Sequence, residues 1–373
     1  MPQTEWTYKP NLERTLERRC AFYRREMNDQ VLAVFSIAGM PRTHHLRCVP
    51  DYRRMCQVQI EFLQARRRLD DDWVPLAQTH FGMGVFGGIF GSEVIWRPDD
   101  ETSWSREPFS VWPERLAERL RFDAADPLVD LVRRSIRYHR KQAGGQFGIG
   151  VLETIDALNL VTVLRGPTQG FQDLYLFPDL VREVMELGVQ WNIDWLEMQL
   201  AEAGSFADGW CSLVDWFPWP TVWLSVDAYG SCHSDVYVKL GRDYMQRLID
   251  HFGCGWQHLH SDGVRLLPEI VRLRNLVGLQ IGEDVGYPRP FDIVRDLQLV
   301  TGEIPLQIGC TWHEFTSGIE QGTLAGGVEY HVSGAPTLAA ASRMAAAARE
   351  YRDDARARKE IVEVVTCAQK GVE

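Results

Sequence analysis

Four short apolar runs in the last third of the chain decide the fold: residues 255–260 (GWQHLH), 276–281 (LVGLQI), 304–308 (IPLQI) and 327–332 (GVEYHV). Helix-like segments follow them at 263–274, 290–301, 312–321 and 337–351. Strands that alternate with helices of about 10 to 15 residues indicate parallel β-α-β units. This part of the chain therefore predicts four consecutive strand–helix repeats.

The same rhythm extends toward the N-terminus. Residues 31–38 (VLAVFSIA) form a near-continuous apolar run, which is typical of a buried parallel strand. Further strands are expected at 73–79, at 146–152 and within the Trp-rich stretch 210–227. Helices are expected at 51–69, 113–142, 177–203 and 237–251, and a glycine-rich loop is expected at 82–91. About eight repeats close a (β/α)8 barrel.

The predicted fold class is therefore α/β, as a single (β/α)8 TIM barrel with an N-terminal helical extension. No linker rich in Gly, Pro and Ser interrupts the chain. We expect an N-terminal helical region with the first strand at 1–70, the rest of the barrel at 71–360 and a C-terminal tail at 361–373.

The composition argues against several classes of protein. The 373 residues carry a formal net charge of -11, which argues against nucleic acid because phosphate binding needs a basic surface. No apolar run approaches the roughly 20 residues of a membrane helix, and the N-terminus does not resemble a signal peptide. The 8 cysteines include no Cys-x-x-Cys pair, which indicates reduced thiols. We expect a cytoplasmic protein with a small-molecule substrate.

In a (β/α) barrel the reaction site lies where the strands end and the following loops begin. The predicted strand ends carry these residues: His80, Glu153, Asp227, His260 with Asp262, Glu283 with Asp284, Cys310 with Trp312, and His331 with Ser333. Nearly every strand thus ends in a group that can bind a metal or move a proton. Surface loops are polar in any protein, so part of this set is expected by chance.

The most specific segment is His258-Leu259-His260-Ser261-Asp262-Gly263. Alternation along a strand places residues 258, 260 and 262 on one face. An imidazole beside a carboxylate suits zinc or a similar divalent metal. We expect His260 and Asp262 as ligands, with Cys310 or His331 as a third. The alternatives are a His–Asp hydrogen bond that stiffens the loop, and an inert Cys310.

The remaining candidates serve acid–base chemistry or substrate binding. Asp227 and Glu153 are the predicted acid–base groups of a reaction that needs no metal. Predicted substrate contacts come from His80, Tyr229, Glu283 and Trp312. The tryptophans of residues 210–223 fit either core packing or an aromatic wall around an organic ligand.

These motifs resemble the uroporphyrinogen decarboxylase superfamily, in particular its decarboxylase-like proteins and cobalamin-dependent methyltransferases. The resemblance covers residues 50–351. It is carried by residues 260–263 (HSDG), 234–237 (SDVY) before Tyr244, and 326–328 (GGV) before the helix that ends at Tyr351. Weaker similarity lies at 81–84 (FGMG), at 160–166 and in the helix from Pro178.

The resemblance implies a barrel with an N-terminal helical region, often dimeric. Zinc-containing members have a His-x-Cys pair where this chain has His260 and Asp262, and a cysteine near the last strand, where it has His331 and Ser333. They use zinc to hold a thiol as thiolate, which attacks the methyl group of a methylcorrinoid. Tetrapyrrole decarboxylases have Arg-Gln-Ala-Gly-Arg after the first strand. Here residues 36–40 read SIAGM, without the arginines, so that substrate is disfavoured.

Three functions remain open. The first is metal-assisted methyl transfer involving a corrinoid, carried by a partner protein, or a small thiol. The second is a metal-free decarboxylase or lyase that acts on a carboxylated or aromatic small molecule. The third is a non-catalytic member that binds a corrinoid protein or a metabolite. We favour the first, with zinc as the candidate metal.

Overall fold

The computed structural model describes residues 5–40, 50–97, 102–155, 157–213 and 215–357. Two compact units divide the chain. The first comprises Met1–Met40, Arg66–Val74 and Trp256–Glu373, and the second comprises Pro41–Ala65 and Pro75–Gly255. The boundaries expected at residues 70 and 360 remain predictions, and the expected tail at 361–373 lies outside the described residues.

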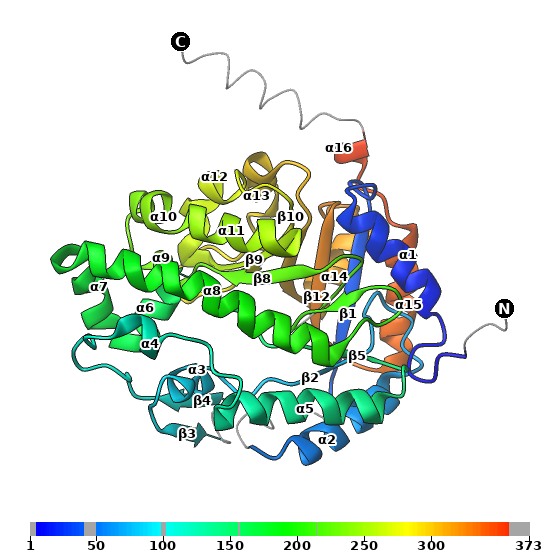
Figure 1. Cartoon of the computed structure of the whole chain (residues 1–373). Coiled ribbons are helices and arrows are strands. Elements are labelled where there is room, and N and C mark those ends of the chain that lie inside the picture. Colours follow the sequence, from blue (N-terminus) through cyan, green and yellow to red (C-terminus); the bar gives the residue numbers. More distant parts are fainter. Residues whose placement is uncertain (1–4, 41–49, 98–101, 156, 214, 358–373) are drawn as a thin grey trace, which may run out of the picture. The chain divides into compact units, whose positions relative to one another are not determined.

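Six strands form the main sheet, in the order β1-β12-β11-β10-β9-β8. Their bounds are β1 (Val31–Ile37), β8 (Thr221–Ser225), β9 (Cys254–His260), β10 (Leu276–Gly282), β11 (Leu306–Thr311) and β12 (Val328–Ala335). The pairs β1·β12, β12·β11 and β11·β10 are parallel, and Figure 1 shows β1 in blue beside β12 in orange. The α/β class is confirmed. The described strands form no closed sheet, so closure into a (β/α)8 barrel remains a prediction.

Three helices of the first unit follow its strands as the apolar rhythm predicts: α13 (Val294–Thr301), α14 (Trp312–Gln321) and α15 (Leu338–Glu350). Helix α1 (Leu12–Tyr23) precedes β1, and α16 (Asp354–Ala357) follows α15. The helix expected at 263–274 is instead a 3-10 helix, η3 (Ser261–Leu266), followed by the single turn α12 (Leu267–Ile270). Asn275, which precedes β10, has a φ of 57°, in the left-handed region. A right-handed helix cannot run through a residue with this backbone conformation.

The second unit is mostly helical between short strands. Its helices are α2 (Tyr52–Arg66, with its last residue in the first unit), α3 (Gly84–Ile89), α4 (Leu116–Arg119), α5 (Pro127–Ala143), α6 (Ala157–Arg165), α7 (Pro167–Leu176), α8 (Pro178–Ala203), α9 (Asp227–Gly230), α10 (Ser234–Leu240) and α11 (Arg242–Phe252). Besides β8, it has the parallel pair β2 (Leu76–Gln78) with β5 (Gly148–Gly150), and the antiparallel pairs β3 (Val94–Arg97) with β4 (Thr102–Ser105) and β6 (Trp210–Cys211) with β7 (Trp216–Phe217).

The glycine-rich segment 82–91 was expected to be a loop, and the structure shows that it contains the helix α3. Close backbone approach overrides the low helix propensity of glycine. A side chain at Gly84 would lie 2.5 Å from the backbone of Trp104 in β4, so only glycine lets the helix lie against this strand. The expected loop is therefore wrong for residues 84–89, which are helical.

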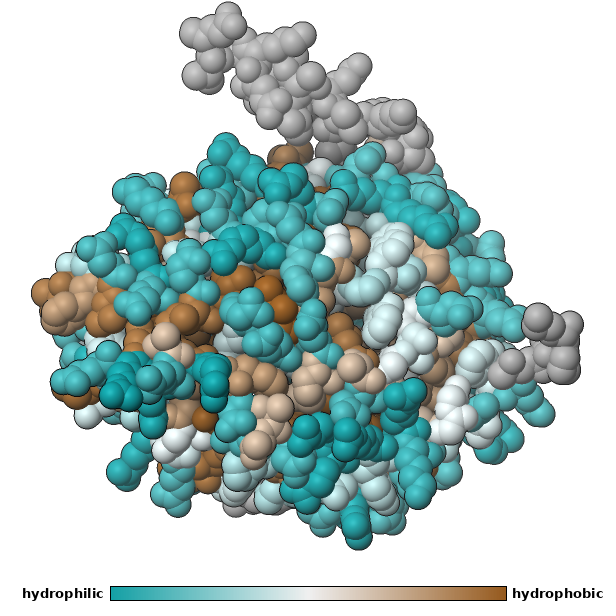
Figure 2. Space-filling view, in the orientation of Figure 1, coloured by the Kyte–Doolittle hydropathy of each residue, from teal (hydrophilic) through white to brown (hydrophobic). Residues whose placement is uncertain are grey.

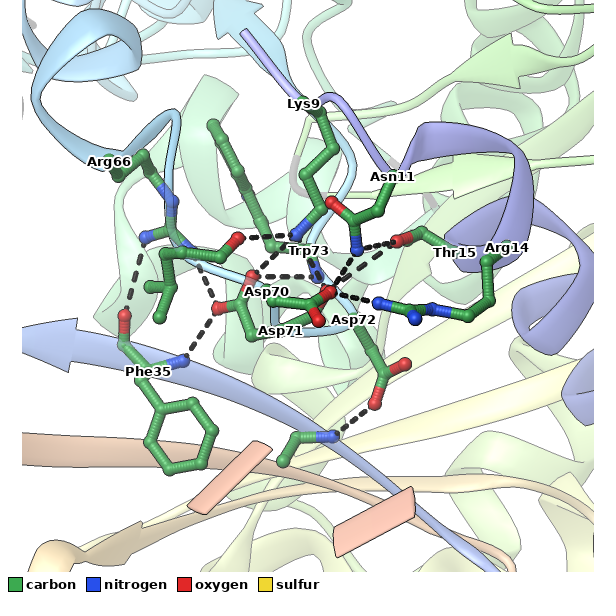
Figure 3. A network of polar contacts seen from close by, with 12 residues as sticks. Lys9, Asn11, Arg14, Thr15, Phe35, Arg66, Asp70, Asp71, Asp72 and Trp73 are labelled. Atoms are coloured by element: carbon green, nitrogen blue, oxygen red, sulfur yellow. Dashed lines mark hydrogen bonds and ion pairs between the residues drawn. The ribbon is translucent and has the colours of Figure 1, made fainter. Parts of the chain in front are cut away.

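A buried ionic network holds the N-terminus of the first unit against β1 (Figure 3). The ammonium of Lys9, only 2% exposed, lies 2.9 Å from the carboxylate of Asp71. Asp71 also binds the guanidinium of Arg66 at 2.7 Å and the backbone N–H of Phe35 at 3.1 Å. Asp72 binds the N–H of Ala33 at 3.0 Å. The segment 70–73 therefore supplies side-chain and backbone partners for β1.

The surface of the second unit carries an apolar group at the junction of α7 and α8. Tyr175, Leu176 and Phe177 are 76%, 65% and 51% exposed, and brown residues gather where Figure 1 labels α7 (Figure 2). Among the described helices, none combines the length and the apolar character that crossing a membrane requires.

Candidate functional site

One side of β9–β12 in the first unit concentrates polar side chains that a sheet interior normally lacks. Gln280 in β10 is the register partner of Gln307 in β11, and Gln307 is the partner of Glu329 in β12. Because side chains alternate along a strand, residues two positions further lie on the same side. There the strands carry Gly282, Gly309 and His331. We call this side, together with His258 and His260 of β9, the imidazole face.

Two histidines of β9 lie next to each other on the imidazole face. The ring centroids of His258 and His260 are 4.8 Å apart, and a ligand nitrogen of each lies within 4.8 Å of the other. The Nδ1 of His258 donates a hydrogen bond to the Oε1 of Gln280 at 2.8 Å. This bond fixes the tautomer, so the Nε2 of His258 is the nitrogen with the lone pair.

The second imidazole is oriented by a carboxylate. The Nδ1 of His260 donates to the Oδ1 of Asp284 at 3.0 Å, and the Oδ2 of Asp284 accepts the backbone N–H of Asp262 at 3.2 Å. His260 is 38% exposed, so its Nε2 belongs to a ring that solvent and ligands reach. An imidazole whose other nitrogen binds a carboxylate or a carbonyl is the usual arrangement of a histidine that ligates a metal.

His331 has the same kind of support from a deeper residue. Its Nε2 donates to the Oε1 of Glu329 at 3.1 Å, and the same carboxylate oxygen lies 2.7 Å from the guanidinium of Arg19. Glu329 is fully buried, and His331 is 39% exposed. Burial raises the pKa of Glu329, but the charge of Arg19 and the hydrogen bond from His331 lower it to about 2. The carboxylate is therefore ionised and holds both partners.

Two of the expected metal ligands, Asp262 and Cys310, do not share the strand alternation of the imidazole face. Strand β9 ends at His260, and Asp262 belongs to η3, so strand alternation does not extend to Asp262. Cys310 is the register partner of Val332 and is one residue removed from Gly309, so it lies on the opposite side of β11. Burial raises the pKa of the Cys310 thiol to about 12, which keeps it protonated.

Two expected substrate contacts lie beyond the strand ends of the same unit. Glu283 is exposed and lies 3.3 Å from Arg289. Arg289 binds Glu314 through Nη1 and Nη2 of its guanidinium, and Glu314 closes the capping box of α14 with Thr311. Trp312 begins α14 and packs edge-on against Phe35 with ring centroids 5.9 Å apart.

The second unit brings together two further expected residues, His80 and Glu153. They follow β2 and β5, and both are buried, with exposed fractions of 7% and 8%. The backbone N–H of Gly82 donates to the Nδ1 of His80 at 3.0 Å, so the Nε2 carries the proton and donates to the Oε1 of Glu153 at 3.1 Å. This pair can transfer a proton.

The other two expected residues of the second unit, Asp227 and Tyr229, both belong to α9. Asp227 is exposed at the start of α9, where its backbone N–H donates to the Oγ of Ser225 at 3.3 Å. Tyr229 is fully buried, and its hydroxyl donates to the carbonyl of Leu240 at 2.7 Å. These contacts give Tyr229 the position of a core residue.

Sequence reasoning missed the glutamines of the imidazole face. Gln280 and Gln307 stand within apolar runs that were interpreted only as strands. A glutamine in the middle of an apolar run is the signal that indicates such a position. A buried amide side chain needs hydrogen-bond partners that the sheet backbone does not supply, so other polar groups are expected beside it.

Comparisons with known proteins bear on the fold. No protein-family model matches this sequence, and no curated protein matches it. Among solved structures, a methyltransferase from Methanosarcina mazei is similar with a TM-score of 0.60, over 93% of this chain and 99% of that chain. The two sequences are 12% identical, so the similarity concerns the fold alone. The chain therefore shares its fold with this methyltransferase.

Proposed function

We propose that this chain is a metal-assisted methyltransferase in which His258 and His260 bind a divalent metal, with zinc as the first candidate. The observation that carries the proposal is that each ring has its Nδ1 fixed by an oxygen, of Gln280 at 2.8 Å and of Asp284 at 3.0 Å. Both rings then offer Nε2, and imidazole nitrogen is a preferred zinc ligand. The fold shared with a methyltransferase supports the reaction class.

Asp262 and His331 are the candidates for a third ligand. Asp262 follows the two histidines in η3, and His331 lies on the imidazole face with its Nε2 bound to Glu329. A catalytic zinc site keeps a position open for the substrate, so three protein ligands suffice. The position of Cys310 on the other side of β11 leaves it outside the proposed set.

A divalent metal at this place would act as a Lewis acid and as a template for the methyl acceptor. The residues of the chain have distinct tasks. Asp284 and Gln280 keep the two imidazoles in the ligand tautomer, and the pair of Arg19 with Glu329 holds His331 in place. We propose a small thiol as the acceptor and a corrinoid, carried by a partner protein, as the methyl donor.

The test combines metal content with turnover. Elemental analysis of the purified wild type should give about one equivalent of a divalent metal per chain, as expected for a single mononuclear site. His258→Ala and His260→Ala should lose it, together with demethylation of methylcobalamin in the presence of a small thiol. His313→Ala is the matched control, because this exposed histidine lies on α14 outside the imidazole face. Metal that stays bound in both variants contradicts the proposal.

The buried pair of His80 and Glu153 favours one second candidate, a metal-free decarboxylase or lyase. There Glu153 would exchange a proton with the substrate through His80, and the exposed carboxylate of Asp227 is the other candidate acid–base group. Glu153→Gln and Asp227→Asn separate the two roles. This function requires turnover that withstands EDTA and falls in one of these variants.

A further inference from the structure

We infer that the open space at Gly309, two residues from the buried amide of Gln307, forms a niche that binds the neutral carbonyl oxygen of a small organic substrate. The inference deepens the proposed function, on which it rests, because it names the chemical class of the molecule that lies beside the histidines. It depends on three features of the first unit: an amide nitrogen without a hydrogen-bond partner among the described residues, open space at Gly309, and a floor whose charges are paired.

The first feature is a directed chain of hydrogen bonds. The Nδ1 of His258 donates to the Oε1 of Gln280, and the Nε2 of Gln280 donates to the Oε1 of Gln307. The chain ends at the Nε2 of Gln307, which is buried and has no hydrogen-bond partner among the described residues. Gln307 is 1% exposed. A buried donor without a partner is costly, and an acceptor from a ligand would satisfy it.

The second feature is space. Gly309 lies two residues beyond Gln307 on the same side of β11, and a methyl group placed there would meet none of the described residues within 4 Å. Gly309 is also the register partner of His331. On the neighbouring strand, a methyl group at Gly282 would lie 3.2 Å from the ring of His260. The opening at Gly309 is therefore flanked by His331 and by the imidazole that covers Gly282.

The third feature is charge. Gln307 is the register partner of Glu329, whose carboxylate lies 2.7 Å from the guanidinium of Arg19. The two charges compensate each other, so the floor of the niche offers a hydrogen-bond donor without a net charge. Among the described residues of this floor, the cation Arg19 is already paired with Glu329 and offers a bound carboxylate no counter-charge, whereas a neutral carbonyl needs only the donor. The niche therefore favours an amide or a ketone over a carboxylate.

Binding of propionamide and propionate, measured by saturation-transfer NMR on the full chain, tests the inference. Propionamide should receive saturation from the wild type, and propionate should not. Gly309→Val fills the niche, and Gln307→Leu removes the donor. Each should reduce the propionamide signal at least about fivefold, the factor expected for one lost hydrogen bond. Gln298→Leu is the matched control, because Gln298 is a buried glutamine of α13 that binds the carbonyl of Gly326.

The outcomes separate this inference from the proposed function. Propionamide binding should persist after dialysis against EDTA, and binding that disappears with the metal would overturn the inference, because it would assign the carbonyl to the metal. Equal signals for wild type and both variants, no propionamide signal, or preferential binding of propionate would each overturn it as well. Failure of the proposed function would appear instead as missing metal in the wild type, with propionamide binding intact.

Discussion

The guanidinium of Arg19 lies 2.7 Å from the carboxylate of Glu329, and both side chains are buried within the first unit. This ion pair joins α1 to β12, and the carboxylate of Glu329 also accepts a hydrogen bond from His331. Removal of one partner leaves a buried charge, which typically costs about 3–5 kcal/mol. The pair thus links the N-terminal helix to His331, the register partner of Gly309.

We expect Glu329→Gln to destabilise the protein by about 3–5 kcal/mol at neutral pH and to change the pH dependence of stability. The folded-state pKa of Glu329 is lowered from 4.5 to about 2. Its contribution is therefore present above the unfolded value and is lost as pH falls from 4.5 toward 2. Measured by urea unfolding across this pH range, the free energy of unfolding should fall less steeply with decreasing pH in the variant than in the wild type. Equal pH dependence of the two proteins would contradict the role assigned to Glu329.

The network around Lys9 predicts different effects for two neighbouring aspartates. Asp71 is fully buried between Lys9 and Arg66, so Asp71→Asn should cost about 3 kcal/mol or more. Asp70 is 34% exposed and binds Arg14 and Arg349 near the surface, so Asp70→Asn should cost about 1 kcal/mol or less. Thermal and urea unfolding measure the stability of both variants. Equal losses of stability would show that burial does not determine how much each aspartate of this network contributes.

Two glycines of the imidazole face should differ in their effect on metal affinity. A methyl group at Gly282 would lie 3.2 Å from the Nδ1 of His260, the nitrogen that binds Asp284. Gly282→Ala should therefore weaken metal binding about 10- to 100-fold, as loss of such supporting contacts typically does. Gly309→Ala meets open space and should leave the affinity unchanged. Competition with a fluorescent zinc chelator measures both. Equal affinities for the two variants would place the metal away from His260.

Cys310→Ala should keep the metal. The thiol lies on the side of β11 opposite Gly309 and is 4% exposed, so the substitution should cost about 1 kcal/mol of stability and no metal. Elemental analysis of this variant decides the point. Loss of the metal on this change would restore the cysteine to the ligand set that the sequence suggested.

The sequence predicted those parts of the fold that depend on local pattern. The apolar runs at 255–260 and 276–281 became β9 and β10 nearly residue for residue. Closure of the sheet was not predictable from such patterns, because β2 and β5 have three residues each and their pairing depends on contacts distant in sequence. The (β/α)8 barrel therefore remains a prediction for this chain.

For the site, the sequence placed His260 and Asp284 at strand ends, and a hydrogen bond joins them in the structure. Their role in binding a metal remains a prediction. The alternation that was expected to place Asp262 on the same face as His258 does not apply, because the strand ends at His260 and a 3-10 helix begins. The position of Cys310 depends on the register of β11, in which a shift by one residue reverses the side. Whether Gln307 faces the site depends on the side of β11 that its side chain occupies. The pairing of β10, β11 and β12 sets this side, and the sequence does not show that pairing.

The central claim is that β9 provides a nitrogen-rich metal site, and X-ray absorption spectroscopy of the zinc-loaded chain tests it most directly. The expected result is a shell of nitrogen and oxygen at about 2.0–2.1 Å with the outer-shell scattering of at least two imidazoles. This scattering should decrease in His260→Ala. A sulfur shell at about 2.3 Å, or a spectrum without imidazole scattering, would contradict the assignment of His258 and His260 as the ligands.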